Sequence, residues 1–78
     1  MHESPTRIRV ESYAGYRGEE RPRRLLLDDR TVEVAEILDA WRAPEHRYFR
    51  ILGADGATYL IRRVTVTGLW ELESYEPG

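Results

Sequence analysis

The sequence predicts an all-β domain, a small barrel of five to six strands of the SH3-like or open type. Short segments with alternating apolar and polar residues recur along the chain, with Gly, Pro or Asp turn signals between them. An Asp-Gly pair at 55–56 separates two aromatic and branched runs, which is the strongest short-range signal for a β-hairpin. The length of 78 residues suits one domain. Because a lone hairpin is not stable, the other strands must cover its apolar face.

The hairpin of residues 47–63 is the best defined element. Side chains alternate between the two faces of a strand, so the loop length decides which residues share a face. A three-residue loop of Ala54, Asp55 and Gly56 collects the apolar side chains on one face, whereas a two-residue loop mixes Arg62 into it. We therefore expect a type I turn with a left-handed Gly56. The predicted apolar face consists of Phe49, Ile51, Tyr59 and Ile61.

The opposite face of the hairpin has a mixed character. It carries the side chains of Tyr48, Arg50, Leu52, Thr58, Leu60 and Arg62. Such a face is either solvated or a binding surface.

The chain before the hairpin begins with two shorter strands. Residues 6–13 alternate as a half-buried strand, and residues 14–22 form a loop with two glycines and a proline. Residues 23–27 form a short strand, and residues 28–30 form a tight turn. The two aspartates of this turn are expected to make local backbone bonds rather than a metal or acid–base site.

Residues 31–42 are ambiguous between strand and helix. Four apolar residues have helical spacing: Val34, Ile37, Leu38 and Trp41. The β-branched residues of the segment favour a strand, and a bulge near residues 35–36 would absorb the change in apolar phase and bend the strand. We expect the bent strand. The alternative is a curved antiparallel sheet with one short helix at 33–42.

The chain after the hairpin contributes the last strand. Residues 64–67 continue the second arm of the hairpin or form a short strand, and Gly68 turns the chain. Residues 69–75 alternate again. One face of this last strand is predicted to carry Trp70, Leu72 and Ser74.

The chain is expected to form a disordered tail at 1–5 and a single β domain at 6–76. The core of that domain is built from the apolar side of each predicted strand. The predicted core residues are Ile8, Val10, Leu26, Val32, Val34, Ile37, Trp41, Phe49, Ile51, Tyr59, Ile61, Trp70 and Leu72.

Composition bears on the class of function. The chain has no lysine and no cysteine, so neither a lysine amine nor a thiolate is available as nucleophile or metal ligand. His46 is the only histidine outside the tail, and we expect it at a strand edge rather than in a catalytic triad. We therefore expect no catalysis, no cofactor and no metal. No apolar run is long enough to span a bilayer, and the lack of cysteine fits a cytoplasmic location without membrane contact.

Arginine is concentrated between residues 42 and 63, although the net charge of the chain is −2. Small barrels bind single-stranded nucleic acid with arginine on the phosphates and aromatic rings under the bases. In the competing interpretation the face is solvated, and Glu71 and Glu73 of the last strand pair with the arginines. The candidate contact residues for a protein or nucleic-acid partner are Arg42, Arg47, Tyr48, Arg50, Leu60, Arg62 and Arg63.

Apolar residues outside the predicted core point to a protein partner or a homodimer. These residues are Tyr13, Tyr16, Tyr48, Leu52, Leu60, Leu69 and Tyr75. Exposed apolar patches on small domains commonly mark interaction sites. A barrel with a free edge can also accept a strand from another chain.

Several motifs carry a family resemblance. They are Val34-x-Glu36-Ile37-Leu38-x-x-Trp41, Arg47-Tyr-Phe-Arg-Ile51, Asp55-Gly56, Tyr59-Leu-Ile61 and Trp70-Glu-Leu72. This set resembles a family of small bacterial β-domain proteins of uncharacterised function. Its second half, residues 47–75, is also similar to the C-terminal extension of Y-family DNA polymerase-like proteins of damage-induced mutagenesis. The resemblance implies a bacterial accessory domain near DNA-repair machinery, without catalytic polymerase motifs.

The sequence therefore predicts a non-catalytic cytoplasmic accessory domain that contacts a macromolecular partner through the Arg/Tyr/Leu face of residues 47–63. A protein partner is favoured. The alternative is a single-stranded nucleic-acid-binding barrel associated with DNA repair.

Overall fold

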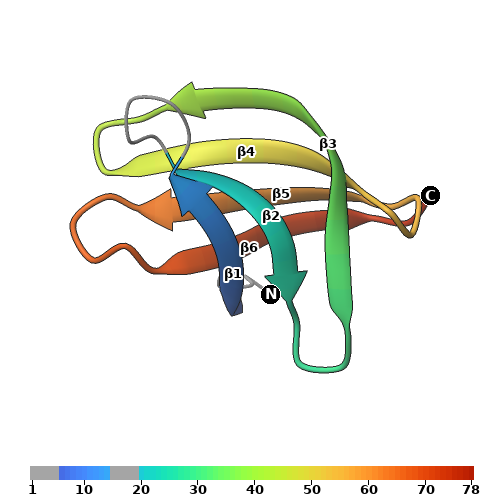
Figure 1. The fold of residues 1–78 in the computed structure, drawn as a ribbon. Coiled ribbons are helices and arrows are strands. Elements are labelled where there is room, and N and C mark those ends of the chain that lie inside the picture. The colour runs from blue at the N-terminus through green and yellow to red at the C-terminus, as the bar shows by residue number, and fades with distance from the viewer. Residues whose placement is uncertain (1–5, 15–19) are drawn as a thin grey trace, which may run out of the picture.

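Six antiparallel β-strands build the part of the molecule that the structure describes (Figure 1). The structure is a computed structural model that describes residues 6–14 and 20–78. The strands are β1 (Thr6–Ala14), β2 (Glu20–Leu26), β3 (Thr31–Arg42), β4 (His46–Gly53), β5 (Thr58–Val64) and β6 (Trp70–Glu76). No helix occurs in the described ranges, which confirms the all-β class. The alternative with a helix at 33–42 is wrong, because those residues belong to β3. The predicted tail at 1–5 lies outside the described residues.

The strands close into a small barrel. Each strand pairs with the next along the chain, and β6 returns to pair with β1 through Ile8 opposite Trp70. The seam between β2 and β3 is short, since its ladder contains only the pairs from Arg24–Glu33 to Leu26–Thr31. Beyond this ladder β2 continues back to Glu20, so it begins before the predicted residue 23.

The β4–β5 hairpin has the predicted turn. The Gly53 N–H donates to the Ala57 carbonyl at 2.8 Å, and the Gly56 N–H donates to the Gly53 carbonyl at 3.0 Å. Gly56 has a φ of 89°, the left-handed region that favours glycine. The apolar face forms as predicted, with the cross-strand pairs Phe49–Ile61 and Ile51–Tyr59 pointing into the barrel.

The inward side chains of all six strands form one core. Its buried apolar members are Ile8, Leu25, Val32, Phe49, Ile51, Ala57, Tyr59, Ile61 and Trp70. Val10, Val34, Ile37 and Leu72 pack against this cluster as partly buried residues. The prediction was wrong in β2, where Leu25 rather than Leu26 is fully buried.

Strand β3 bends through two irregularities, and the second one moves Trp41 out of the core. The first register shift lies between Val34 and Glu36, where a bulge was predicted. The second lies between Ile37 and Asp39 and was not predicted. Each bulge adds one residue to the strand and so reverses the alternation of side chains beyond it. Trp41 consequently lies on the outer surface, 37% exposed, and its assignment to the core was wrong.

A register shift also changes the end of β6. The pairing of β5 with β6 slips between Leu60 and Ile61, which pair with Ser74 and Leu72. Beyond the slip, Tyr75 faces Tyr59, with ring centroids 5.1 Å apart. The prediction that Ser74 shares the face of Leu72 was therefore wrong, because a bulge lies between them.

Candidate binding surface

The fold divides the seven predicted contact residues between two places. Tyr48, Arg50, Leu60 and Arg62 point outward from β4 and β5. Arg42, Arg47 and Arg63 lie around one cavity at the end of the barrel where β3 meets β4. The arginines that are concentrated between residues 42 and 63 of the sequence thus lie on two separate surfaces.

An aromatic stack dominates the outward surface. Trp41 of β3 lies directly opposite Tyr48 of β4 in the register, and their rings are parallel within 5° at 5.2 Å between centroids. The guanidinium carbon of Arg50 lies 5.9 Å from the Trp41 centroid, a cation–π arrangement. We call the outward surface of Trp41, Tyr48, Arg50, Leu52, Leu60 and Arg62 the hairpin face.

Two half-buried leucines extend the aromatic stack across the hairpin face. Leu52 and Leu60 point outward beside Arg50. Leu60 and Arg50, together with residues of β6, line a hollow of about 260 Å³. The face therefore combines rings, aliphatic side chains and one exposed guanidinium.

Arg62 is held by carboxylates of β6. Its Nε donates to Glu71 at 2.7 Å, and its Nη1 lies 2.8 Å from Glu73 Oε2. Partial burial by itself lowers the pKa of Arg62, but the hydrogen bonds to Glu71 and Tyr48 and the two negative charges outweigh it and raise that pKa. The expected neutralisation by Glu71 and Glu73 is therefore present at Arg62. In the described ranges, Arg50 has no ion pair.

The charge around the hairpin face is negative in balance. Glu36 lies opposite Leu52 in the register, and Asp39 lies opposite Arg50. With Glu71 and Glu73, which pair with Arg62, the outer side of β3 and β6 carries four acidic residues against the two arginines Arg50 and Arg62. Phosphate backbones bind surfaces with excess positive charge, which the hairpin face lacks.

The cavity at the barrel end brings three arginines together. Arg42 lies opposite Arg47 in the β3–β4 register, and Arg47 lies opposite Arg63 in the β4–β5 register. The three residues thus form a single row across three strands, which we call the arginine row. The cavity beside the row measures about 300 Å³ and is also lined by His46 and Thr65.

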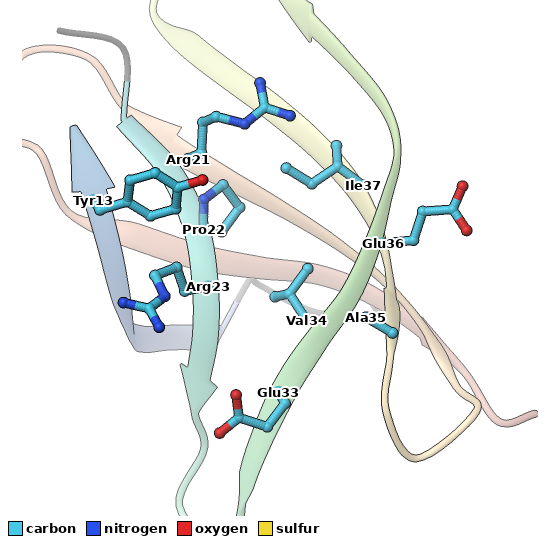
Figure 2. Close-up of a pocket in the computed structure, with 9 residues that line it drawn as sticks. All are labelled: Tyr13, Arg21, Pro22, Arg23, Glu33, Val34, Ala35, Glu36 and Ile37. Atoms are coloured by element: carbon cyan, nitrogen blue, oxygen red, sulfur yellow. The ribbon is translucent and has the colours of Figure 1, made fainter. Parts of the chain in front are cut away.

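A groove opens where the β2–β3 ladder ends (Figure 2). It measures about 380 Å³, and its walls include Arg21 and Arg23 of β2 and Val34 and Ile37 of β3. Figure 2 shows Val34 and Ile37 on one side of the β3 ribbon and Glu36 on the other. The groove is a consequence of the short seam. It contains none of the seven candidate contact residues, but Tyr13, one of the apolar residues predicted outside the core, lines it.

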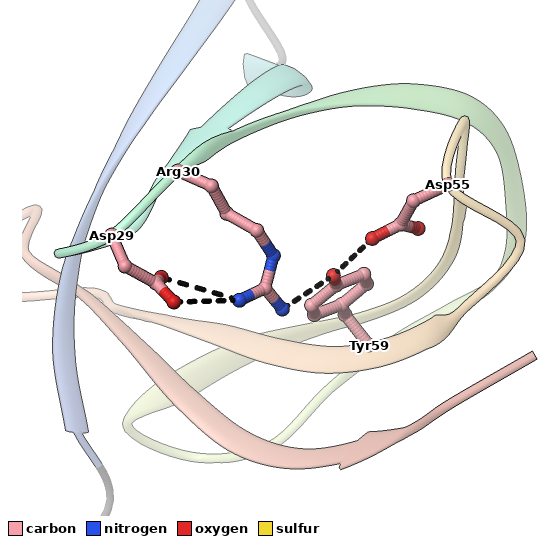
Figure 3. A network of polar contacts seen from close by, with 4 residues as sticks. All are labelled: Asp29, Arg30, Asp55 and Tyr59. Carbon is pink, nitrogen blue, oxygen red and sulfur yellow. Dashed lines mark hydrogen bonds and ion pairs between the residues drawn. The ribbon is translucent and has the colours of Figure 1, made fainter.

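A polar network ties two turns together at the opposite end of the β4–β5 hairpin (Figure 3). Arg30 Nη2 donates to Tyr59 Oη at 3.1 Å, and Tyr59 Oη donates to Asp55 at 2.7 Å. This bond and the Ala57 N–H lower the pKa of Asp55, while burial and the bond to Asp55 raise the pKa of Tyr59. Residues 28–30 form the tight connection between β2 and β3 that was predicted, closed by the Leu27 N–H donating to the Arg30 carbonyl at 2.8 Å. Asp29 pairs with the Arg30 side chain at 3.2 Å, which is a side-chain contact and not the predicted backbone bond.

No reactive constellation emerges from the part of the chain that the structure describes. Within residues 6–14 and 20–78, no group of three or more His, Asp or Glu side chains is placed to hold a metal ion. His46 contacts Tyr48, with ring centroids 5.9 Å apart, which is its only ring contact among the described residues. No helix in these ranges has the length and apolar character needed to cross a membrane.

Comparison of the chain with protein-family models, curated proteins and solved structures finds no match. The family resemblance therefore stays an expectation, and function has to be argued from the surface itself. Trp41 is the residue of that surface which the sequence interpretation missed. The outward-pointing aromatic residue opposite it, Tyr48, was the available signal, since aromatic side chains commonly pair across strands.

Proposed function

We propose that this chain is a non-catalytic, cytoplasmic accessory domain that binds a protein partner through the hairpin face. The stack of Trp41 on Tyr48, with Arg50 above Trp41, is the observation that carries the proposal. Trp, Tyr and Arg are the residue types most enriched among the residues that dominate binding energy at protein interfaces. Leu52 and Leu60 add apolar area beside them.

The surroundings of the stack also favour a protein partner. The carboxylates of Glu36, Asp39, Glu71 and Glu73 form a charged border around an aromatic and aliphatic centre. Protein interfaces commonly have such a border, which keeps the apolar centre dry once the partner is bound. The same carboxylates repel phosphate groups.

The proposal is tested by affinity capture from lysate of the source cell with Trp41→Ala, Leu60→Asp and the matched control Tyr13→Ala. Tyr13 is an exposed aromatic residue of β1, 52% exposed, that contacts Arg23 and lies outside the hairpin face. We expect a protein that wild type and Tyr13→Ala retain and that both face variants lose. With that partner purified, Trp41→Ala should weaken binding by about tenfold or more, as expected for an interface hot spot. Retention of every captured protein by both face variants would exclude the hairpin face as the contact.

Single-stranded nucleic acid is the second candidate, and the parallel Trp41–Tyr48 pair is the observation that favours it. Exposed aromatic rings beside an arginine can stack with bases. A mixed-sequence single-stranded DNA titrated into the protein, followed by two-dimensional amide NMR, distinguishes the candidates. Shifts around Trp41, Tyr48 and Arg50 that persist at physiological salt indicate nucleic-acid binding, whereas a salt-sensitive response or none favours the protein partner. Line widths in the same spectra reveal a homodimer.

A further inference from the structure

The arginine row is an arrangement that stability alone does not favour. Arg42, Arg47 and Arg63 are consecutive cross-strand neighbours on β3, β4 and β5. Side chains directly opposite one another in a sheet are close together, and like charges in that position are destabilising.

The row lies at the mouth of the barrel and not on the hairpin face. Arg47 and Arg63 share the side of their strands with the buried Phe49 and Ile61, as strand alternation requires. The guanidinium carbon of Arg47 lies 5.2 Å from the Phe49 ring centroid. None of the three arginines is isolated, because each has interactions of its own in the structure. What distinguishes them is that three cations surround one cavity.

The cavity supplies further polar groups. It measures about 300 Å³, and His46 and Thr65 line it together with the arginine row. The Thr65 N–H donates to the Glu45 carbonyl at 3.0 Å, which fixes the β5–β6 connection against the β3–β4 turn. The site is thus a concave surface whose rim is held in place by backbone hydrogen bonds.

Three guanidinium groups select for a multiply charged oxyanion. Arginine presents a planar array of donors that fits phosphate and carboxylate oxygens in pairs. A carboxylate carries a single negative charge, whereas a phosphate monoester carries about −1.5 to −2 at neutral pH and three acceptor oxygens. The phosphate group therefore matches three cations better than a carboxylate does.

We propose that the cavity at the arginine row binds a small phosphate monoester, whose phosphate group lies between Arg42, Arg47 and Arg63. The hairpin face is a separate surface, and this site does not depend on it. A bound phosphate places its negative charge among three cations that are neighbours in the sheet. Thr65 supplies a hydroxyl that can hydrogen-bond the bound group.

The test uses inorganic phosphate as the probe and NMR spectra that resolve arginine Nε–H groups. Phosphate is titrated into the whole chain, and sodium acetate and sodium chloride at matched ionic strength serve as controls. We expect saturable shifts of the Arg47 and Arg63 Nε–H groups with phosphate that acetate and chloride do not reproduce. Equal shifts with all three salts, or none with phosphate, would overturn the proposal without bearing on the hairpin face.

Two variants and one matched control locate the site. Arg47→Gln and Arg42→Gln should each weaken phosphate binding by about tenfold or more, since each removes hydrogen bonds to a charged group. Arg50→Gln removes an arginine from the same strand β4, but one that lies over Trp41 on the opposite face. It should leave phosphate affinity unchanged. If Arg50→Gln weakens binding as much as Arg47→Gln, the effect is one of overall charge and the proposed site is wrong.

The source of the phosphate is distinguished by a second pair of probes. A single-stranded oligonucleotide with a 5′-phosphate is compared with the same oligonucleotide ending in a hydroxyl. If the ligand is a free phosphate monoester, inorganic phosphate should bind and compete with the phosphorylated oligonucleotide. If both oligonucleotides bind equally and inorganic phosphate does not compete, the row recognises a nucleic-acid backbone and the small-molecule assignment is overturned.

Discussion

The two ends of the β4–β5 hairpin differ in how their charged side chains are arranged. At the turn, Asp29, Arg30, Tyr59 and Asp55 form a chain in which donors and acceptors alternate (Figure 3). At the other end, Arg47 and Arg63 lie side by side with Arg42 beside them. The same two strands therefore carry one network of opposite charges and one row of like charges.

This difference separates a structural role from a binding role. A network that satisfies its own donors and acceptors stabilises the turn and has little left to offer a ligand. A row of like charges costs stability and is better compensated by a ligand of opposite charge. Substitutions at the turn should therefore change the stability of the fold, whereas substitutions at the arginine row should change the binding of a ligand.

Two glycines with positive φ among the described residues provide the largest expected contrast. Gly56 has a φ of 89° and Gly68 a φ of 77°, so alanine at either position should destabilise the protein by about 1–2 kcal/mol. A Cβ at Gly56 meets no atom within 4 Å, whereas one at Gly68 lies 3.2 Å from Arg63 Nη2. Gly68→Ala should therefore also displace Arg63 and weaken phosphate binding.

Urea denaturation measures the stability of both variants, and NMR of the arginine side chains during a phosphate titration measures their affinity for phosphate. Gly56→Ala is the control, since it shares the backbone cost and lies at the far end of the hairpin. Equal phosphate affinity in the two variants would show that the position of Arg63 is unimportant for binding.

Removing the central hydroxyl of the network should have a smaller effect. Tyr59→Phe eliminates the hydrogen bond to Asp55 and the one from Arg30, at a cost of about 1 kcal/mol in the free energy of unfolding. Tyr75→Phe is the matched control, because among the described residues the Tyr75 hydroxyl makes no hydrogen bond. Thermal unfolding of both variants checks this prediction. A loss of stability in Tyr75→Phe as large as that in Tyr59→Phe would contradict it.

The smallest effect is expected in the dependence of stability on pH. The hydrogen bonds from Tyr59 and the Ala57 N–H hold the pKa of Asp55 below its usual range. A carboxylate with a lowered pKa in the folded state stabilises the fold above its ordinary pKa of about 4, and this contribution is lost as the pH falls through the folded pKa. Asp55→Asn should therefore be less stable than wild type at neutral pH, and the difference should shrink towards about pH 2. A constant difference across that range would contradict the role of the charge.

The sequence was informative where structure is local. The turn at Ala54–Gly56 and the inward face of Phe49 and Ile51 depend on neighbouring residues and on alternation, and both were predicted. The first bulge in β3 was also predicted, because the apolar residues change phase there. The pairing of Arg62 with Glu71 and Glu73 of the last strand, one of the two interpretations of the arginines, is also present in the structure.

The errors arise where pairing with another strand decides the outcome. Trp41 has the spacing of a core residue, and only the pairing of β3 with β4 reveals the second bulge. The exchange of Leu26 for Leu25 in β2 has the same kind of origin, since Leu25 lies opposite the buried Val32 of β3 and shares its inward side. The arginine row was invisible in the sequence as a row, because its members come from three strands whose register is set by tertiary structure.

The second bulge in β3 has a consequence for how this surface can change during evolution. If β3 ran without this bulge and kept its length, strict alternation beyond Ile37 would turn Trp41 inward and Arg42 outward. The hairpin face would then lose its stacked ring, and the arginine row would lose its first member, although neither residue had been replaced. Two descendants of this chain could thus share six strands and nearly every amino acid and still present different surfaces to their partners.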